Sequence, residues 1–147
     1  MSKILLINGP NLNMLGIRNT NLYGNMSLQD INNDIQKFAD KDGISIDFFQ
    51  SNIEGELIDC IHKAYGVYQG IIINPGAYAH YSIAIRDAIE AVSIPAIEVH
   101  ISNIHSREQF RRHSVISEVC IGQISGLGYH GYIYAMNALN TYLKGVH

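Results

Sequence analysis

Polar residues that can bind a ligand or transfer a proton follow three short hydrophobic runs of this chain. Each run predicts a buried strand, and the polar or turn-forming residues after it mark its end. The three segments are Lys3–Ile7 followed by Asn8-Gly9-Pro10-Asn11, Gly70–Ile73 followed by Asn74-Pro75-Gly76-Ala77-Tyr78, and Ala96–Val99 followed by His100-Ile101-Ser102-Asn103. Ligands of open parallel sheets bind beyond the carboxyl ends of the strands. These residues therefore predict a site for a small, oxygen-rich molecule.

The third segment contains a candidate acid. Glu98 and His100 are two residues apart in a predicted strand, so their side chains point to the same face. A carboxylate next to an imidazole stabilises the protonated ring and fixes its orientation. The pair therefore predicts a general acid.

Two arginines follow this pair. Arg107 and Arg111 are four residues apart, and on a helix they would share a face that suits a carboxylate or hydroxyl-rich ligand. A solvated basic turn is the alternative interpretation. His100 and His105 lack metal-ligand spacing with a third His, Cys or carboxylate, so no metal site is expected.

The loop after the first strand is long for a connection between a strand and a helix. The segment from Asn8 to Met26 shows neither helical nor strand periodicity. Loops of this length in compact domains are commonly lids or binding loops. Arg18 and Tyr23 lie in it and become candidates for a lid over a polar site.

The elements that must position these residues alternate along the chain. Strands are predicted at 4–7, 44–49, 70–73, 96–99 and 119–124, and helices from Ser27 to just before Gly43 and at about 55–65, 81–92 and 129–143. This alternation predicts an α/β fold with a parallel sheet and right-handed crossovers. A flavodoxin-like, doubly wound sheet of order 2-1-3-4-5 with helices on both faces is the natural choice. The helix at 81–92 is apolar on more than one face, which indicates either a large core or a subunit contact.

The length and composition of the chain limit the class of protein to which it can belong. A chain of 147 residues that is 47% hydrophobic and 16% charged fits one domain, residues 1–147. A net charge of −3 does not indicate a protein that binds nucleic acid or an anionic membrane surface. The apolar run at residues 4–7 is too short for a signal peptide, and no stretch approaches the ~20 apolar residues of a membrane span, so neither is expected. Cys60 and Cys120 are isolated in apolar segments, which predicts buried thiols in a reducing compartment, and the cytoplasm is the expected location.

A literal G-x-G-x-x-G lies at Gly126–Gly131. A dinucleotide fingerprint also needs a following strand with an acidic residue roughly 20 positions on. The chain ends too soon for that unit, so we predict glycines for a tight turn and for close helix packing.

The strand-end segments together resemble the type II 3-dehydroquinate dehydratases. The matching stretches are Ile7–Asn13, Gly16-Ile17-Arg18, Tyr23-Gly24, Gln50-Ser51-Asn52, Glu54-Gly55, Asn74–Tyr78 with His80, Arg86-Asp87-Ala88, Glu98–Asn103, Arg107 and Phe110-Arg111. They cover nearly the whole chain at the expected spacings. Departures are local: Asn19-Thr20 stands for the usual Glu-Pro of the lid, Gln109 for a proline and Arg112 for a common histidine.

The resemblance implies an enzyme that converts 3-dehydroquinate to 3-dehydroshikimate in the shikimate route to aromatic amino acids, without metal or organic cofactor. It implies Tyr23 as base beside Arg18, Asn11 holding a water against the enolate oxygen, and His100 as acid oriented by Glu98. The substrate-binding residues that it implies are Asn74, His80, Ile101, Ser102 and Arg111, with Asp87 reaching in from a neighbouring subunit. The resemblance also implies a homo-oligomer, because members of the family form dodecamers that are built as tetramers of trimers.

The sequence disfavours a Schiff-base route to the same product. That route needs a lysine at a strand end, and none of Lys3, Lys37, Lys41, Lys63 and Lys144 follows a strand toward the site.

Two other classes of protein remain open. A flavodoxin-like mononucleotide-binding protein would need a phosphate loop after the first strand, where Asn-Pro-Asn substitutes poorly for Ser/Thr and glycine. A non-catalytic sugar-acid binding protein on the same scaffold would bind dehydroquinate without turnover.

Overall fold

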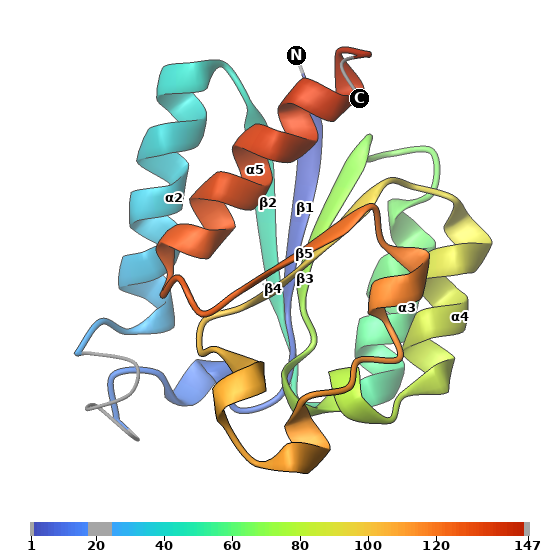
Figure 1. Ribbon diagram of the computed structural model, residues 1–147. Coiled ribbons are helices and arrows are strands. Elements are labelled where there is room, and N and C mark those ends of the chain that lie inside the picture. The colour runs from blue at the N-terminus through green and yellow to red at the C-terminus, as the bar shows by residue number, and fades with distance from the viewer. Residues whose placement is uncertain (1, 18–24, 146–147) are drawn as a thin grey trace.

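The computed structural model describes residues 2–17 and 25–145 of the chain (Figure 1). Within them the strands are β1 (Lys3–Asn8), β2 (Ser45–Gln50), β3 (Gly70–Asn74), β4 (Ala96–His100) and β5 (Gly122–Ser125). The α-helices are α2 (Leu28–Asp42), α3 (Glu54–Ala64), α4 (Ile83–Val92) and α5 (His130–Leu143). Short 3-10 helices occupy Leu12–Met14, Gly76–His80, Ile104–Ser106, Gln109–Arg111 and Ser117–Val119.

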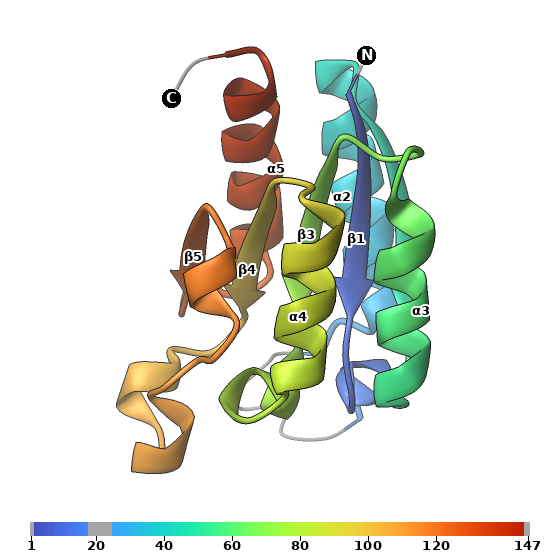
Figure 2. The same cartoon turned by 90° about the vertical axis from the view of Figure 1, so that its right-hand side faces the viewer.

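The five strands form one parallel sheet in the order β2-β1-β3-β4-β5, which confirms the predicted flavodoxin-like topology. Its register aligns the ends of strands that are far apart in sequence: Asn8 lies beside Asn74, and Glu98 lies beside Gln123. The polar residues that end β1, β3 and β4 therefore share one edge of the sheet, which lies at the bottom of Figures 1 and 2.

Helices cover both faces of the sheet. Helices α2 and α5 lie on one face and α3 and α4 on the other, as the two views at right angles show (Figures 1 and 2). Alternate residues of β1 supply both cores: Ile4 and Leu6 pack toward α2 and α5, whereas Leu5 and Ile7 pack toward α3 and α4. All of β3 is buried, because a central parallel strand has helices on both sides.

Helix α2 begins and ends where the sequence predicts. The Ser27 side chain accepts a hydrogen bond from the Asp30 N–H, and the Asp30 carboxylate accepts one from the Ser27 N–H, which completes a capping box. Gly43 ends the helix at a φ of 68°, a left-handed conformation that glycine adopts without penalty.

Two element boundaries differ from the prediction by two residues or more, and one predicted loop contains a short helix. Strand β5 begins at Gly122 rather than at Val119, because Ser117–Val119 forms a 3-10 turn. Helix α4 begins at Ile83 rather than at Tyr81, because the Ser82 side chain caps it by accepting from the Ile85 N–H. Within the predicted lid loop, Leu12–Met14 forms a 3-10 helix.

The segment Gly126–Gly131 contains the predicted tight turn. Gly126 and Gly128 have φ values of +89° and +65°, as a tight turn requires. A Cβ atom at Gly131 would lie 3.4 Å from Ile124 and Val99, an ordinary van der Waals distance, so the packing of α5 on the sheet does not depend on glycine there. Among the described residues, no helix is long and apolar enough to cross a membrane.

Candidate active site

A pocket of about 140 Å³ lies at the carboxyl edge of the sheet. Its walls come from the ends of β1, β3 and β4 and from the turns that follow them. The lining residues are Asn11, Leu12, Asn74, Gly76, Ala77, His80, His100, Ile101, Ser102, Ile104, Arg107 and Arg111. The lining therefore combines amides, imidazoles, a hydroxyl and guanidinium groups, which suits an anionic, hydroxyl-rich molecule.

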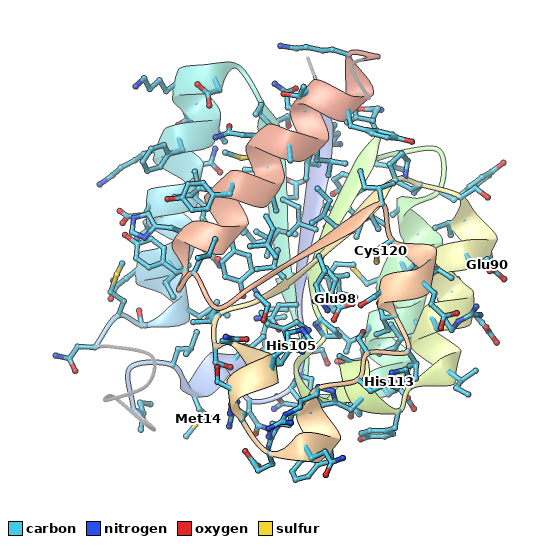
Figure 3. All side chains as sticks on the ribbon, in the orientation of Figure 1. Met14, Glu90, Glu98, His105, His113 and Cys120 are labelled. Carbon is cyan, nitrogen blue, oxygen red and sulfur yellow. The ribbon has the colours of Figure 1, made fainter. Side chains whose placement is uncertain are left out.

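Glu98 and His100 face one another as their spacing predicts. The His100 Nε2 atom lies 2.5 Å from Glu98 Oε2, and both side chains are buried, with 5% of His100 and none of Glu98 exposed. Figure 3 shows Glu98 in the interior of the molecule, above the edge where His105 and His113 lie. His100 lines the pocket and Glu98 lies behind it, so the carboxylate orients the imidazole from outside the ligand space.

Glu98 is held as a carboxylate. Burial by itself would raise the pKa of Glu98, but the hydrogen bond and the charge of His100, with hydrogen bonds from Ser114 and Ser117, outweigh burial. The pKa of Glu98 is therefore lowered from its ordinary value, so Glu98 is ionised at neutral pH and accepts the His100 Nε2 proton.

Asn74 reaches the pocket from the end of β3. It is only 3% exposed, and its Oδ1 atom accepts a hydrogen bond of 3.1 Å from the Gly76 N–H. Its Nδ2 atom donates to the hydroxyl of Tyr132 on α5 at 2.8 Å. Both bonds fix the orientation of the amide at the pocket wall.

Asn11 has a backbone φ of 70°, a left-handed conformation that asparagine tolerates better than most residues. Its N–H donates a hydrogen bond of 2.9 Å to Asn52 Oδ1, which ties this turn to the segment after β2. The preceding turn requires Gly9, because a Cβ atom there would lie 2.6 Å from the Pro75 carbonyl oxygen. The loops after β1 and β3 therefore pack directly on each other.

His80 presents a neutral imidazole. Its Nδ1 atom lies 2.8 Å from the His113 carbonyl oxygen, so the Nδ1–H donates and Nε2 keeps a free lone pair. Desolvation lowers the pKa of His80 despite that bond, and the neighbouring His100 and Arg111 lower it further. The ring stacks on His100 with 6.3 Å between the centroids.

Arg107 and Arg111 both line the pocket, but the predicted shared helix face is wrong. Arg107 follows the 3-10 helix Ile104–Ser106, and Arg111 ends the separate one at Gln109–Arg111. Arg107 Nη1 lies 3.3 Å from Ser102 Oγ, whereas Arg111 Nε donates to Glu108 at 3.0 Å. Two successive turns, rather than one helix, aim both side chains at the pocket.

The other predicted site residues are Arg18, Tyr23 and Asp87. Arg18 and Tyr23 fall outside the described residues. Asp87 lies on α4 with 64% of its side chain exposed and is paired with Arg86 at 3.3 Å. It does not line the pocket of its own chain.

Sequence reasoning missed several residues that support this site. Tyr132, Ser114, Ser117 and Gln123 contact site residues from behind, and no spacing signal connects them to residues so distant in the chain. Asn52 stood within a stretch that matched the resemblance, but its role in holding Asn11 appears only in the structure.

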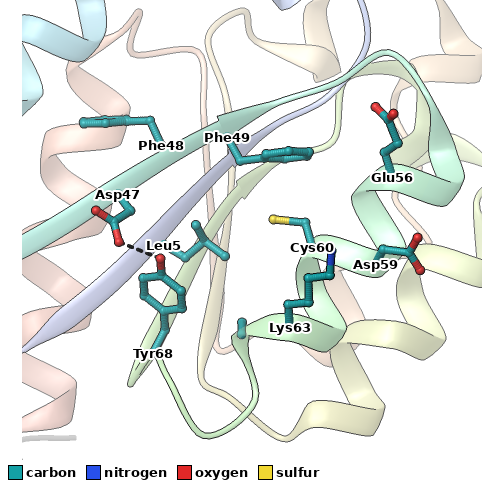
Figure 4. Close-up of a pocket in the computed structure, with 10 residues that line it drawn as sticks. Leu5, Asp47, Phe48, Phe49, Glu56, Asp59, Cys60, Lys63 and Tyr68 are labelled. Atoms are coloured by element: carbon teal, nitrogen blue, oxygen red, sulfur yellow. Dashed lines mark hydrogen bonds between the residues drawn. The ribbon is translucent and has the colours of Figure 1, made fainter.

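A larger hollow of about 460 Å³ lies between β2 and α3, away from the strand ends (Figure 4). Its lining includes the carboxylates of Asp47, Glu56 and Asp59 against one lysine, Lys63, which disfavours an anionic ligand. Burial raises the pKa of its Cys60 thiol to about 11, so Cys60 is not a ready nucleophile. We therefore assign the chemistry to the smaller, strand-end pocket.

Fold and pocket together define a doubly wound α/β protein with a small-molecule site at the carboxyl edge of its sheet. Residues 2–140 match the family model described as Dehydroquinase class II, and the chain belongs to that family.

Relatives and solved structures agree. The chain is 58% identical to a 3-dehydroquinate dehydratase of Bacillus cytotoxicus, over 95% of each chain. It is 59% identical to that of Caldicellulosiruptor bescii, over 97% of this chain and 99% of the relative. The crystal structure of a type II dehydroquinase from Butyrivibrio crossotus superposes with a TM-score of 0.93 at 54% identity, covering 95% of this chain and 97% of that one.

Proposed function

We propose that this protein is a type II 3-dehydroquinate dehydratase, which removes water from 3-dehydroquinate to give 3-dehydroshikimate in the shikimate pathway. The observation that carries the proposal is the buried Glu98–His100 pair, which opens onto a pocket that also contains Arg111 and Asn74. Family membership names the substrate, and the pocket supplies an acid and cationic donors for a hydroxylated carboxylic acid.

The reaction needs a base, a site for negative charge and an acid. A base removes the proton alpha to the ketone, which leaves an enolate, and the departing hydroxyl takes a proton and leaves as water. A free phenol has a pKa of ~10, so a tyrosine serves as base at neutral pH only when a cation stabilises its phenolate. We assign the base to Tyr23 and the cation to Arg18.

The described residues supply the other roles. Asn11 holds a water molecule against the enolate oxygen, and His100, oriented by Glu98, protonates the leaving hydroxyl. Asn74, His80, Ile101, Ser102 and Arg111 bind the carboxylate and hydroxyl groups of the substrate; all of them line the pocket. No step requires a metal ion or an organic cofactor.

Assembly belongs to the same proposal. We infer a homododecamer, a tetramer of trimers, in which Asp87 completes the site of a neighbouring subunit. Exposed Ile83 and Asp87 on α4 support this, since both are available to a partner. We place the enzyme in the cytoplasm.

A direct assay tests the function. Pure protein is mixed with 3-dehydroquinate, and the absorbance of the conjugated enone of the product is followed. Growth of that absorbance supports the proposal. Binding of dehydroquinate without turnover would make the protein a sugar-acid binder, and a flavin spectrum in the purified protein would favour a mononucleotide-binding protein.

A further inference from the structure

Four side chains surround the Glu98 carboxylate, and three of them lie outside the pocket. Ser114 Oγ lies 2.8 Å from Oε1, Ser117 Oγ lies 3.0 Å from Oε1, and Gln123 Nε2 lies 3.1 Å from Oε2. His100 Nε2 is the fourth donor. Since an ionised carboxylate accepts about four hydrogen bonds, its capacity is filled.

The fold brings these donors together from separate segments. Gln123 lies on β5 directly beside Glu98 in the register of β4 and β5. Ser114 and Ser117 lie in the segment that precedes β5, around the start of the 3-10 helix Ser117–Val119. The edge strand and the segment that leads to it therefore cover the carboxylate.

The backbone sets the direction of the Ser114 hydroxyl. Its oxygen accepts hydrogen bonds from the Ile116 N–H at 3.1 Å and the Ser117 N–H at 3.2 Å. A hydroxyl has one proton and two lone pairs. With both lone pairs in use, the Ser114 proton is left for Glu98.

The Gln123 amide sets the direction of Ser117 in the same way. Its Nε2 atom donates to Glu98 and, at 3.0 Å, to Ser117 Oγ. Ser117 therefore accepts from Gln123 and donates its own proton to Glu98 Oε1. Every contact points a proton at Glu98, so a neutral carboxyl group would have to break one of them.

The charge of the Glu98 carboxylate also affects the pKa of two neighbouring groups, the Cys120 thiol and the His80 imidazole. Burial, and then the charge of Glu98, raise the pKa of Cys120 to about 12, so Cys120 is a neutral thiol. Burial is the main cause of the lowered pKa of His80, which is also neutral at pH 7. Neither group therefore competes with His100 for the role of acid that the proposed function gives it.

We propose that Ser114, Ser117 and Gln123 are positioning residues of the dehydratase, which lock Glu98 as the acceptor of the His100 Nε2 proton. This lock leaves Nδ1 as the ring nitrogen that serves the pocket. In the elimination, the Nδ1 proton moves to the leaving oxygen as the C–O bond breaks, and water departs. The proposal rests on the proposed function, because it assigns His100 as the acid.

The test uses two independent variants of the full-length protein. Ser114→Ala and Gln123→Met each remove a donor, and the loss of one hydrogen bond to a charged group corresponds to roughly a tenfold or larger fall in kcat. We expect KM to stay close to that of the unmodified protein, since neither side chain lines the pocket. Exchange of the alpha proton of the substrate with solvent deuterium should persist, because that step uses the base.

Controls separate positioning from folding. Ser114→Thr keeps the hydroxyl and should restore most of the turnover. Ser2→Ala removes a serine hydroxyl that bonds Asn140 at the opposite end of the sheet, and should leave turnover unchanged. His100→Ala gives the reference for a missing acid with retained exchange.

Two results would overturn the proposal: near-normal kcat in both Ser114→Ala and Gln123→Met, or turnover, affinity and exchange all lost in parallel. If Ser114→Ala does not fold, Gln123→Met decides alone. Failure of the proposed function would appear differently, as an unmodified protein without turnover. The NMR signal of the His100 Nε2 proton is independent of activity: it should be hydrogen-bonded in the unmodified protein and weakened in both variants, and an unchanged signal would contradict the lock.

Discussion

The Asn74 side chain donates a hydrogen bond of 2.8 Å to the hydroxyl of Tyr132, a residue 58 positions away in the chain. The Tyr132 hydroxyl donates in turn to Asn8 Oδ1 at 2.6 Å. All three side chains are buried, and Tyr132 is fully so. One phenol from α5 therefore joins the ends of β1 and β3 and orients the amide that faces the pocket.

Tyr132→Phe should weaken both the fold and the site. The change removes the hydrogen-bond partner of Asn74 Nδ2 and of Asn8 Oδ1, and an unsatisfied buried group costs about 1–3 kcal/mol. We expect a lower free energy of unfolding in urea titration and a higher KM. Tyr134→Phe on the same helix is the control, because that side chain is half exposed. Equal stability of the two variants would contradict this role for Tyr132.

Borohydride in the presence of substrate should not inactivate the protein. All five lysines lie within the described residues and none lines the strand-end pocket, so no imine should form there. Mass spectrometry of the treated protein checks this. A reduced covalent adduct on a lysine would establish the Schiff-base route instead.

Tyr23→Phe should reduce turnover by ~10²–10⁴-fold, the usual contribution of a general base. Ligand affinity should largely survive, because the ring remains. Arg18→Gln should fall between this variant and the unmodified enzyme, since the phenolate becomes scarce at neutral pH without the cation. Its activity should recover partly as pH rises toward the free phenol value of ~10. Near-normal turnover in Tyr23→Phe would remove Tyr23 as the base.

Asp87→Asn should weaken substrate binding or assembly without disturbing the fold, if Asp87 completes a neighbouring site. Glu90→Gln is a matched control, since Glu90 lies on the same helix, is equally exposed at 64% and also pairs with Arg86. Light scattering gives the mass, which should be many times 16.4 kDa for the unmodified protein. A fully active monomer would refute the shared site.

Glu98→Gln should change the acid stability of the protein in a defined direction. The pKa of Glu98 is lowered in the fold from 4.5, so its contribution to stability is present above that pH and is lost as pH falls through the folded pKa. The variant places an N–H₂ group where donors already point, and we expect it to be about 1–3 kcal/mol less stable at neutral pH. Urea unfolding from neutral to acid pH should show this difference shrinking below about pH 4.5. A difference that does not change with pH would contradict the assignment.

Local patterns in the sequence determined much of the architecture. Three buried strands, the start of a helix at Ser27 and its end just before Gly43 were all predicted from the sequence, because each depends on neighbours within a few residues. The order of the sheet followed from the alternation of strands and helices. The position of the Glu98 and His100 side chains on the same face followed from the two-residue period of a strand.

The structure of irregular segments was predicted less well from the sequence. The residues from Arg107 to Arg111 have helical spacing, yet they form parts of two 3-10 turns, because tertiary contacts decide the path of such a short segment. Strand β5 was placed too early for a similar reason: Val119 is apolar, but it ends a 3-10 turn.

The support of the site was decided by the tertiary structure alone. Hydrogen bonds from Tyr132 to Asn8 and from Gln123 to Glu98 join residues 124 and 25 positions apart. No local periodicity records such pairs, because they form only when α5 and β5 dock beside strands made much earlier in the chain. The sequence thus identified the groups that could do the chemistry, whereas packing between distant elements decided how those groups are oriented and which charge Glu98 carries.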